Sequence, residues 1–439
     1  MQSRTFKELF AIPLRNGLTK PKAVRGAGTK MVNMGELFSN PRIINVSMDR
    51  VPLSAAERNT SLLAAGDLLF ARQSLVLAGA GKCSIFVNDE EDVCFESHVI
   101  RCRLNNDLAN PHYYFYFFGS PAGRTLIESI VEQGAGASGI RGSDLAELKV
   151  PWIDSSIQTS VARVLRSLDD KIAINRRINQ TLEAMAQAIF KSWFVDFDPV
   201  KAKIAAKQEG REPLRAAMSA ISGKPDAELD ALPPEQYGPL ATTAALFPDK
   251  MDESEFGEIP KGWEVQRVGN LLELAYGKAL KSTDRQEGVV PVYGSGGITG
   301  YHNVALVPNG SIVVGRKGTV GSLFWEDEPF FPIDTTYYVR PLTVPLTYCF
   351  YAMQTLGLEK MNTDAAVPGL NRENVYRLEL IRPDLSILQK FDSEVSSLRK
   401  AIRANSDSNK ALANLRDTLL TKLLSGELSV TEAMAEAEA

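Results

Sequence analysis

Apolar side chains recur at helical spacing in two long stretches of the chain, residues 155–194 and 386–426. Each stretch carries a row of positions seven residues apart, and the first stretch has a second row three residues further on. The rows are Val161, Leu168, Asn175, Leu182 and Ile189, then Val164, Ile178 and Met185, and in the later stretch Phe391, Leu398, Asn405, Leu412 and Leu419. Such rows predict two long helices, each with one apolar seam that needs a partner helix.

The two stretches are copies of one pattern. The positions that align are Gly139, Leu168, Ile172, Asn175, Leu182 and Ile189 with Gly369, Leu398, Ile402, Asn405, Leu412 and Leu419. Each helix is predicted to open with a capping box, Ser155 with Gln158 and Ser386 with Gln389. Because the second copy is available in the same chain, we expect the helices to pair antiparallel as a coiled coil. The alternative is that each helix lies on its own globular domain.

Asn175 and Asn405 lie near the midpoints of the two predicted helices. In an antiparallel pair related by a pseudo-twofold axis the midpoints cross, so we predict that the two amides hydrogen-bond to each other or share a water. A buried amide left unpaired costs roughly 1–3 kcal/mol, so this pair would set the helix register. The alternative is that both side chains face solvent or a partner subunit.

The stretch before each helix is rich in short strands. Residues 66–72 and 310–316 share a glycine, an apolar run and a closing arginine, as a buried strand entering a loop would. The strands that follow also correspond, with 86–87 and 99–104 matching 323–325 and 337–342. The fold class predicted is α+β, with two similar mixed α/β domains separated by a pair of long antiparallel coiled-coil helices in an internal pseudo-twofold repeat. A device that holds two similar domains at a fixed separation is most often used to read a nucleic acid.

Six segments are predicted. They are a first recognition domain (1–152), a first spacer helix (153–198), an acidic connector rich in Pro and Ala (199–258), a second recognition domain (259–385), a second spacer helix (386–427) and a disordered tail (428–439). The connector is interrupted by Pro213, Pro225, Pro233, Pro234, Pro239 and Pro248, so we expect a partly ordered link with one or two short helices.

Composition narrows the classes of protein. The 439 residues are 44% hydrophobic, which is enough for several cores, and no apolar run approaches the ~20 residues of a membrane span. The amino terminus lacks the apolar stretch of a signal peptide, and four cysteines without CxxC spacing favour a reduced, cytoplasmic chain with neither disulfides nor zinc. The net charge of −4 is concentrated in the connector, so the two globular domains are near neutral. That argues against a non-specific nucleic-acid coat and leaves room for local basic loops.

Two short motifs suggest catalysis but fit it poorly. Asn110-Pro111-His112-Tyr113 is similar to the motif that grips adenine in amino-methyltransferases, yet His replaces a proline, and a turn leading into a helix is the better interpretation. The run 79–83 (GAGKC) lacks the first Gly and the Ser/Thr of a P-loop, so we expect a tight turn. Three histidines at unrelated spacings predict neither a metal site nor a triad. The chain is therefore predicted to lack chemistry of its own.

The chain resembles the specificity subunit of type I restriction–modification systems over essentially its whole length. The resemblance rests on SLDDKIAINRRINQTLEAMAQAIFKSWFVDFDPV, GEIPKGWEVQRVGNLL, YGSGGITGYHN and LRDTLLTKLLSGEL. It implies a non-catalytic subunit whose two target-recognition domains bind a bipartite, asymmetric site on double-stranded DNA. The implied partners are two methyltransferase subunits and the motor–nuclease subunits, which would carry S-adenosylmethionine, ATP and Mg. The acidic connector is a departure from a minimal specificity subunit.

Candidate DNA contacts follow from side-chain chemistry, since Arg and Lys suit guanine and phosphate and glycine permits close approach. In the first domain they are Lys20, Lys22, Arg25, Arg72 and Lys82. In the second they are Lys278, Lys281, Tyr293, Thr299, Tyr301, Arg316 and Lys317. Arg72 and Arg316 stand out because they follow matching strands. Two other functions stay open, a stand-alone DNA methyltransferase or nuclease with duplicated binding domains, and a protein scaffold that binds no DNA.

Overall fold

A computed structural model describes residues 2–134, 136–255, 257–361, 369–425, 427–428 and 432. The chain divides into two compact units, Met1–Asn175 with Asp407–Ala439 and Arg176–Ser406. We call them the first and second unit. Among the described residues, no helix has the length and apolarity required to cross a membrane.

The first unit is built on a five-stranded sheet in the order β2-β10-β6-β8-β4. Its strands are β2 (Phe10–Asn16), β10 (Val99–Leu104), β6 (Leu68–Ala71), β8 (Cys83–Asn88) and β4 (Arg42–Ile44). Neighbouring strands run antiparallel except for the parallel pair β4 and β8. Smaller sheets are β5-β3-β9 (Asp49–Val51, Thr29–Val32, Val93–Phe95), β11-β12-β7 (Glu132–Gln133, Ser138–Gly139, Gln73–Ser74) and β1-β13 (Gln2–Thr5, Lys149–Trp152). The short helices are α1 (Met34–Ser39), α2 (Ala55–Ser61), α4 (Pro121–Glu128) and α5 (Gly142–Glu147).

Helix α3 (Pro111–Gly119) supplies much of the core of the first unit. All six residues from Tyr113 to Phe118 are aromatic and buried. The helix begins where it does because the Asn110 side chain accepts hydrogen bonds from two backbone amides of the first turn and Pro111 occupies a position that needs no amide donor. The expectation of a turn and a helix start at Asn110 is confirmed.

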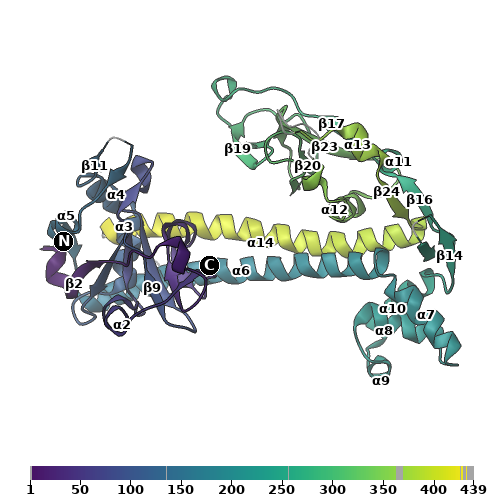
Figure 1. Cartoon of the computed structure of the whole chain (residues 1–439), viewed down its shortest axis with the longest axis horizontal. Coiled ribbons are helices and arrows are strands. Elements are labelled where there is room, and N and C mark those ends of the chain that lie inside the picture. The colour runs from purple at the N-terminus through teal and green to yellow at the C-terminus, as the bar shows by residue number, and fades with distance from the viewer. Residues whose placement is uncertain are drawn as a thin grey trace. The chain divides into compact units, whose positions relative to one another are not determined.

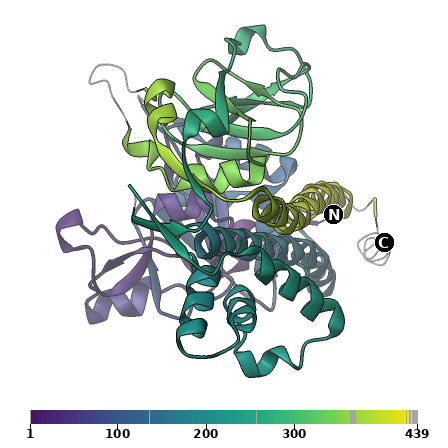
Figure 2. The same ribbon diagram turned by 90° about the vertical axis from the view of Figure 1, so that its right-hand side faces the viewer.

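The second unit repeats the framework of the first. Its four-stranded sheet has the order β17-β23-β20-β21, which matches β2-β10-β6-β8. The strands are β17 (Leu272–Tyr276), β23 (Thr336–Pro341), β20 (Ser311–Gly315) and β21 (Leu323–Glu326), drawn in green in Figure 2. The further elements are β14 (Met251–Ser254), β15 (Gly257–Pro260), β16 (Glu264–Arg267), β18 (Val290–Gly294), β19 (Gly297–His302), β22 (Phe331–Pro332), β24 (Glu379–Arg382), α11 (Val268–Leu271), α12 (Leu346–Gln354) and α13 (Arg372–Arg377). The predicted strand correspondences are confirmed.

The two predicted long helices are present as α6 (Ser155–Phe194) and α14 (Leu385–Ser425), each unbroken in Figure 1. Within the first unit, Asp169 of α6 pairs with Arg416 and Asn175 pairs with Asn409, so the partner number falls as the α6 number rises. Within the second unit, Asn179 pairs with Asn405 and Glu183 with Arg399. The helices therefore run antiparallel, as predicted.

The ends of both long helices also enter the cores of the globular parts. In the first unit Leu165 of α6 and Leu419 of α14 belong to the core that contains α3. In the second unit the rings of Phe194 and Phe391 lie 5.0 Å apart within the core beneath the second sheet. Pairing of the helices and packing on the globular parts thus occur together, although the sequence presented them as alternatives.

Two details of the long helices differ from the predictions. The Gln158 side chain is buried and bonds the backbone of Asn110 and Ile153, so it closes no capping box; Asp154 caps α6 by accepting from the Ser156 amide. Ile178 and Met185 are 43% and 47% exposed, so the predicted second row leaves the seam in the middle of α6. Heptad positions on a straight helix drift by ~20° per heptad, which carries such a row away from its partner.

Asn175 and Asn405 were predicted to bond each other or to share a water, and each bonds another amide within its own unit. Asn175 Nδ2 instead donates to Asn409 Oδ1 at 3.0 Å, and Asn405 Nδ2 donates to Asn179 Oδ1 at 2.9 Å. The repeat aligns Asn175 with Asn405 and Asn179 with Asn409, so these are equivalent bonds of the pseudo-twofold pattern.

The segment 199–258 is more ordered than predicted. It holds the helices α7 (Asp198–Gln208), α8 (Pro213–Ser222), α9 (Asp226–Leu229) and α10 (Pro234–Leu246), seen in teal in Figure 2. Met218, Leu229 and Ala244 form a small core of their own. The prolines start helices more often than they break them, since Pro213 and Pro234 stand in the first turns of α8 and α10. The predicted tail 428–439 lies outside the described residues except for Leu428 and Glu432.

Candidate nucleic-acid interface

Arg72 and Arg316 occupy equivalent places in the two units, as their matching strands predicted. The Arg72 amide donates to the His98 carbonyl at 2.8 Å, and its carbonyl accepts from the Ile140 amide at 3.0 Å. The Arg316 amide and carbonyl bond Thr335 and Leu370 at 2.9 and 2.8 Å. In both units the residue that closes the strand therefore ties three chain segments together at the base of one loop.

Two further glycines, which were not predicted as important, occupy equivalent positions in the two units. A Cβ added to Gly17 would lie 2.1 Å from the Phe95 carbonyl oxygen, and one added to Gly277 would lie 2.1 Å from the Ile333 carbonyl oxygen. Only glycine permits this approach of two backbones. Each glycine directly follows the first strand of its sheet, a signal that a comparison of the two halves could have found.

In the second unit, two arginines lie over the ring of an exposed tyrosine. The guanidinium carbons of Arg316 and Arg372 lie 5.2 and 5.0 Å from the ring centroid of Tyr276, whose side chain is 49% exposed. Arg316 also donates to the Asp334 carbonyl at 2.8 Å, which orients it. Cations stacked on an aromatic face form a surface suited to phosphates and bases. Tyr276 and Arg372 were missed because nothing in their local sequence places them beside Arg316.

The other candidates of the second unit divide into exposed and occupied side chains. Lys278, Lys281, Tyr301 and Lys317 are exposed. Thr299 is exposed too, although its hydroxyl donates to the Val292 carbonyl at 3.2 Å. Tyr293 is buried, and its hydroxyl donates to Glu326 at 2.8 Å, so its ring supports the sheet and is not presented to a ligand. Burial raises the pKa of Tyr293 above its ordinary value.

In the first unit, most candidate cations already have partners. Lys20 pairs with Glu57 at 2.9 Å, Arg25 pairs with Asp49 at 3.0 Å, and the Lys82 ammonium donates to the Phe38 carbonyl at 2.9 Å. Lys22 is exposed and Arg72 is half-buried. None of these contacts joins residues that are close in the sequence, so the sequence alone could not predict them.

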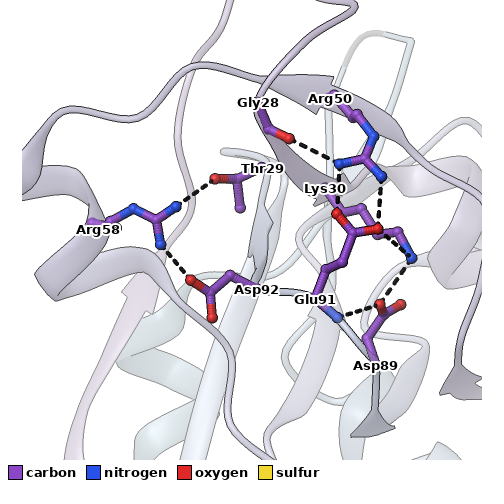
Figure 3. A network of polar contacts seen from close by, with 8 residues as sticks. All are labelled: Gly28, Thr29, Lys30, Arg50, Arg58, Asp89, Glu91 and Asp92. Atoms are coloured by element: carbon purple, nitrogen blue, oxygen red, sulfur yellow. Dashed lines mark hydrogen bonds and ion pairs between the residues drawn. The ribbon is translucent and has the colours of Figure 1, made fainter.

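Figure 3 shows why several further cations of the first unit are not free for phosphate. Arg50 forms a two-pronged contact with Glu91, with both N–O distances 2.7 Å, and Lys30 lies 2.8 Å from Asp89. Arg58 pairs with Asp92 and donates to Thr29. The hydrogen bonds from Arg50 hold the pKa of Glu91 at about 2. The cations and carboxylates of this network neutralise one another beside the sheet β5-β3-β9, so the role of these cations is structural.

The motifs that suggested catalysis have structural roles. Besides capping α3, Asn110 donates a hydrogen bond from its side-chain Nδ2 to the Thr159 hydroxyl at 3.2 Å. The run from Gly79 forms a tight turn, as expected, because Gly81 has a positive φ and a Cβ there would lie 2.3 Å from Ile127. Among the described residues no group of three His, Cys, Asp or Glu side chains is placed to hold a metal ion. The four cysteines are free thiols, and burial raises the pKa of Cys94 to about 11.

Two mixed α/β units with equivalent sheets and antiparallel long helices define a protein with an internally duplicated framework. The family model described as type I restriction modification DNA specificity domain matches residues 1–184 and 260–411. The type I restriction enzyme HindI specificity subunit of Haemophilus influenzae is 28% identical over 434 residues, covering 90% of this chain and 94% of that protein. The MjaIX specificity subunit of Methanocaldococcus jannaschii is 24% identical over 362 residues, covering 73% and 69%.

A solved structure supports the same fold. The crystal structure of the type I restriction–modification system S subunit from M. genitalium superimposes with a TM-score of 0.53 at 17% identity, over 96% of this chain and 95% of that chain. The chain belongs to the family of type I restriction–modification DNA specificity subunits.

Proposed function

We propose that the chain reads a bipartite, asymmetric site on double-stranded DNA, with one half-site bound by each unit. The observation that carries the proposal is a repeated framework whose equivalent loops present different side chains. Beyond Arg72 the first unit has a loop with an apolar tip, whereas in the second unit Arg316 lies over the Tyr276 ring with Arg372 and is followed by the exposed Lys317. Two units that share a framework but differ in their loops are suited to binding two different DNA sequences.

The side chains assigned to DNA are the exposed candidates, together with the half-buried arginines at the loop bases and in the Tyr276 stack. In the second unit they are Lys278, Lys281, Thr299, Tyr301 and Lys317, together with Tyr276, Arg316 and Arg372. In the first unit they are Lys22 and Arg72. Arg and Lys would contact guanine edges and phosphates, and the rings would stack or contact sugars. Near-neutral globular domains with a few placed cations favour specific reading over general attraction to DNA.

The chemistry is assigned to partners. Two methyltransferase subunits would carry S-adenosylmethionine, and motor–nuclease subunits would carry ATP and Mg. The exposed Ile178 and Met185 lie seven residues apart on one face of α6 and offer a helix of the methyltransferase an apolar surface. The structural roles of Asn110 and of the turn at Gly79 support a subunit without a catalytic site of its own.

Reconstitution tests the proposal. The purified chain, the methyltransferase subunit and their complex are each given DNA containing the target and labelled S-adenosylmethionine. Methyl transfer is expected from the complex alone, with protection of both halves of the target in a footprint. The methyltransferase subunit without the chain is the control. Methyl incorporation by the chain alone, or a complex that methylates without regard to sequence, would contradict the proposal.

A further inference from the structure

Three neighbouring apolar side chains of the first unit point into solvent at the tip of one loop. Leu75, Val76 and Leu77 are 89%, 64% and 45% exposed. Such a cluster on a soluble domain costs hydration free energy unless it is covered in use. We call residues 75–77 the tip and the flanking residues 72–74 and 78–82 its stem.

The stem is rigid, so the tip is held outward by structure. On one side Gln73–Ser74 pairs with Ser138–Gly139 in the sheet β11-β12-β7. On the other, the Arg124 guanidinium donates to the carbonyls of Ala78 and Ala80 at 3.1 and 3.4 Å. Inside the loop the Gly79 amide donates to the Val76 carbonyl at 3.0 Å, which closes a short turn. A preformed loop of this kind binds without a further ordering cost.

Charge and repeat position indicate what covers the tip. The segment from Arg72 to Lys82 contains no acidic residue and begins and ends with a cation. It leaves the sheet at the place where the second unit presents Arg316 and Lys317, the loop assigned to DNA. In the second unit the chain returns by Gly321, so the shorter loop 317–320 has no counterpart of the three apolar residues. An apolar tip on a loop that has no acidic residue and has Arg72 at its base fits a polyanion with an apolar interior, which is the base stack of DNA.

We propose that the tip is an apolar wedge that enters the first half-site and separates two stacked base pairs. The proposal rests on the proposed function, because it assumes that the first unit binds DNA. Leu and other apolar side chains inserted at a base step unstack it and kink the duplex. The wedge would select steps that unstack easily, such as pyrimidine–purine steps, and thus contribute to specificity without a hydrogen bond.

Fluorescence of 2-aminopurine tests the wedge. The base analogue is placed at each position of the first half-site in turn, and the complex of the full chain with its methyltransferase subunit is added. The wild-type complex is expected to raise the fluorescence at one step of that half-site. The variant Leu75→Ser/Val76→Ser/Leu77→Ser should abolish the rise and weaken binding by about tenfold or more, since the apolar contact is lost. Val289→Ser, which alters an 88% exposed apolar side chain of the second unit, is the matched control.

Three results would overturn the wedge. The first is a triple variant with unchanged affinity and an unchanged fluorescence rise. The second is weaker binding by the variant with no rise in the wild type, which would make the tip a groove contact. The third is a variant that no longer assembles with the methyltransferase in size-exclusion chromatography, which would assign the tip to a protein partner. Failure of the proposed function is distinct, because the wild-type complex would then not distinguish target from non-target DNA.

Discussion

At the scale of single residues, the carboxylate of Glu91 makes a contribution to stability that depends on pH. Its pKa is about 2, against an ordinary value of 4.5, because Arg50 and Lys30 favour the charged form. A group whose pKa is lowered by folding contributes stability above its ordinary pKa, and that contribution is lost as pH falls from about 4.5 to about 2. Glu57, held at about 2 by Lys20 and Ser54, acts over the same window.

We predict that Glu91→Gln makes the first unit less stable at neutral pH and flattens its loss of stability in that acid window. Urea unfolding at several pH values measures both effects. Glu90→Gln is the control, because it changes the neighbouring carboxylate outside the network of Figure 3. Parallel loss of stability in wild type and Glu91→Gln between about pH 4.5 and about pH 2 would show that the contact with Arg50 is not linked to folding.

Residue-level features could be predicted from sequence only where the signal is local or repeated. Arg72 and Arg316 were found because the strands before them match. The pairing of Lys20 with Glu57, and the burial of Tyr293, depend on residues distant in the sequence, so charge and aromatic character alone suggested DNA contacts. A sequence shows which side chains could bind DNA, but it does not show which of them are already paired with another residue of the protein.

At the scale of elements, amide pairs lie where the long helices approach each other. In the second unit Asn405 donates to Asn179, whose own amide donates to the Ile402 carbonyl at 3.1 Å and the Ser406 hydroxyl at 3.2 Å. Asn175 and Asn409 form the equivalent pair in the first unit. Amides that need specific partners penalise a slipped register more than leucines do.

We predict that Asn405→Leu destabilises the second unit by about 1–2 kcal/mol, because Asn179 Oδ1 loses its donor in a half-buried place. The double variant Asn179→Leu/Asn405→Leu should recover most of the loss, since replacing both partners by apolar groups removes the unpaired amide. Equilibrium unfolding of the single and double variants forms a double-mutant cycle. Asn409→Leu supplies the matched test in the first unit. Additive effects in the cycle would show that the amides do not depend on each other.

The long helices and repeated strands could be predicted because their periodicity extends over many residues. The position of the seam could not, since a small drift per heptad moved Ile178 and Met185 into solvent. The helices of 199–258 were underestimated because prolines were taken as interruptions, although Pro213 and Pro234 occupy first turns where their missing amide costs nothing. Short helices that depend on a shared core such as that of Met218 and Leu229 carry little periodic signal.

At the scale of the whole molecule, the two units share a framework of sheet and helices and differ in their loops. Each sheet core includes residues from both long helices, so the framework of a unit depends on the helices as much as on its own strands. The loops beyond Arg72 and Arg316 share only their bases. Specificity could therefore change by replacement of one globular part while the helices are retained.

We predict that replacing residues 259–385 by the corresponding part of a relative changes one half of the methylated target and leaves the other half unchanged. The donor part must retain large aromatic residues at Trp263, Tyr348 and Tyr351, because these pack in one core with Phe194 and other residues of α6 and α14. Mapping of methylated sites in cells that carry the chimera and the methyltransferase subunit measures the result. The reciprocal exchange of residues 1–152 is the control and should change the other half alone. If either exchange alters both halves, the two units do not read independently, and the pseudo-twofold repeat would then serve assembly and not a division of the DNA site.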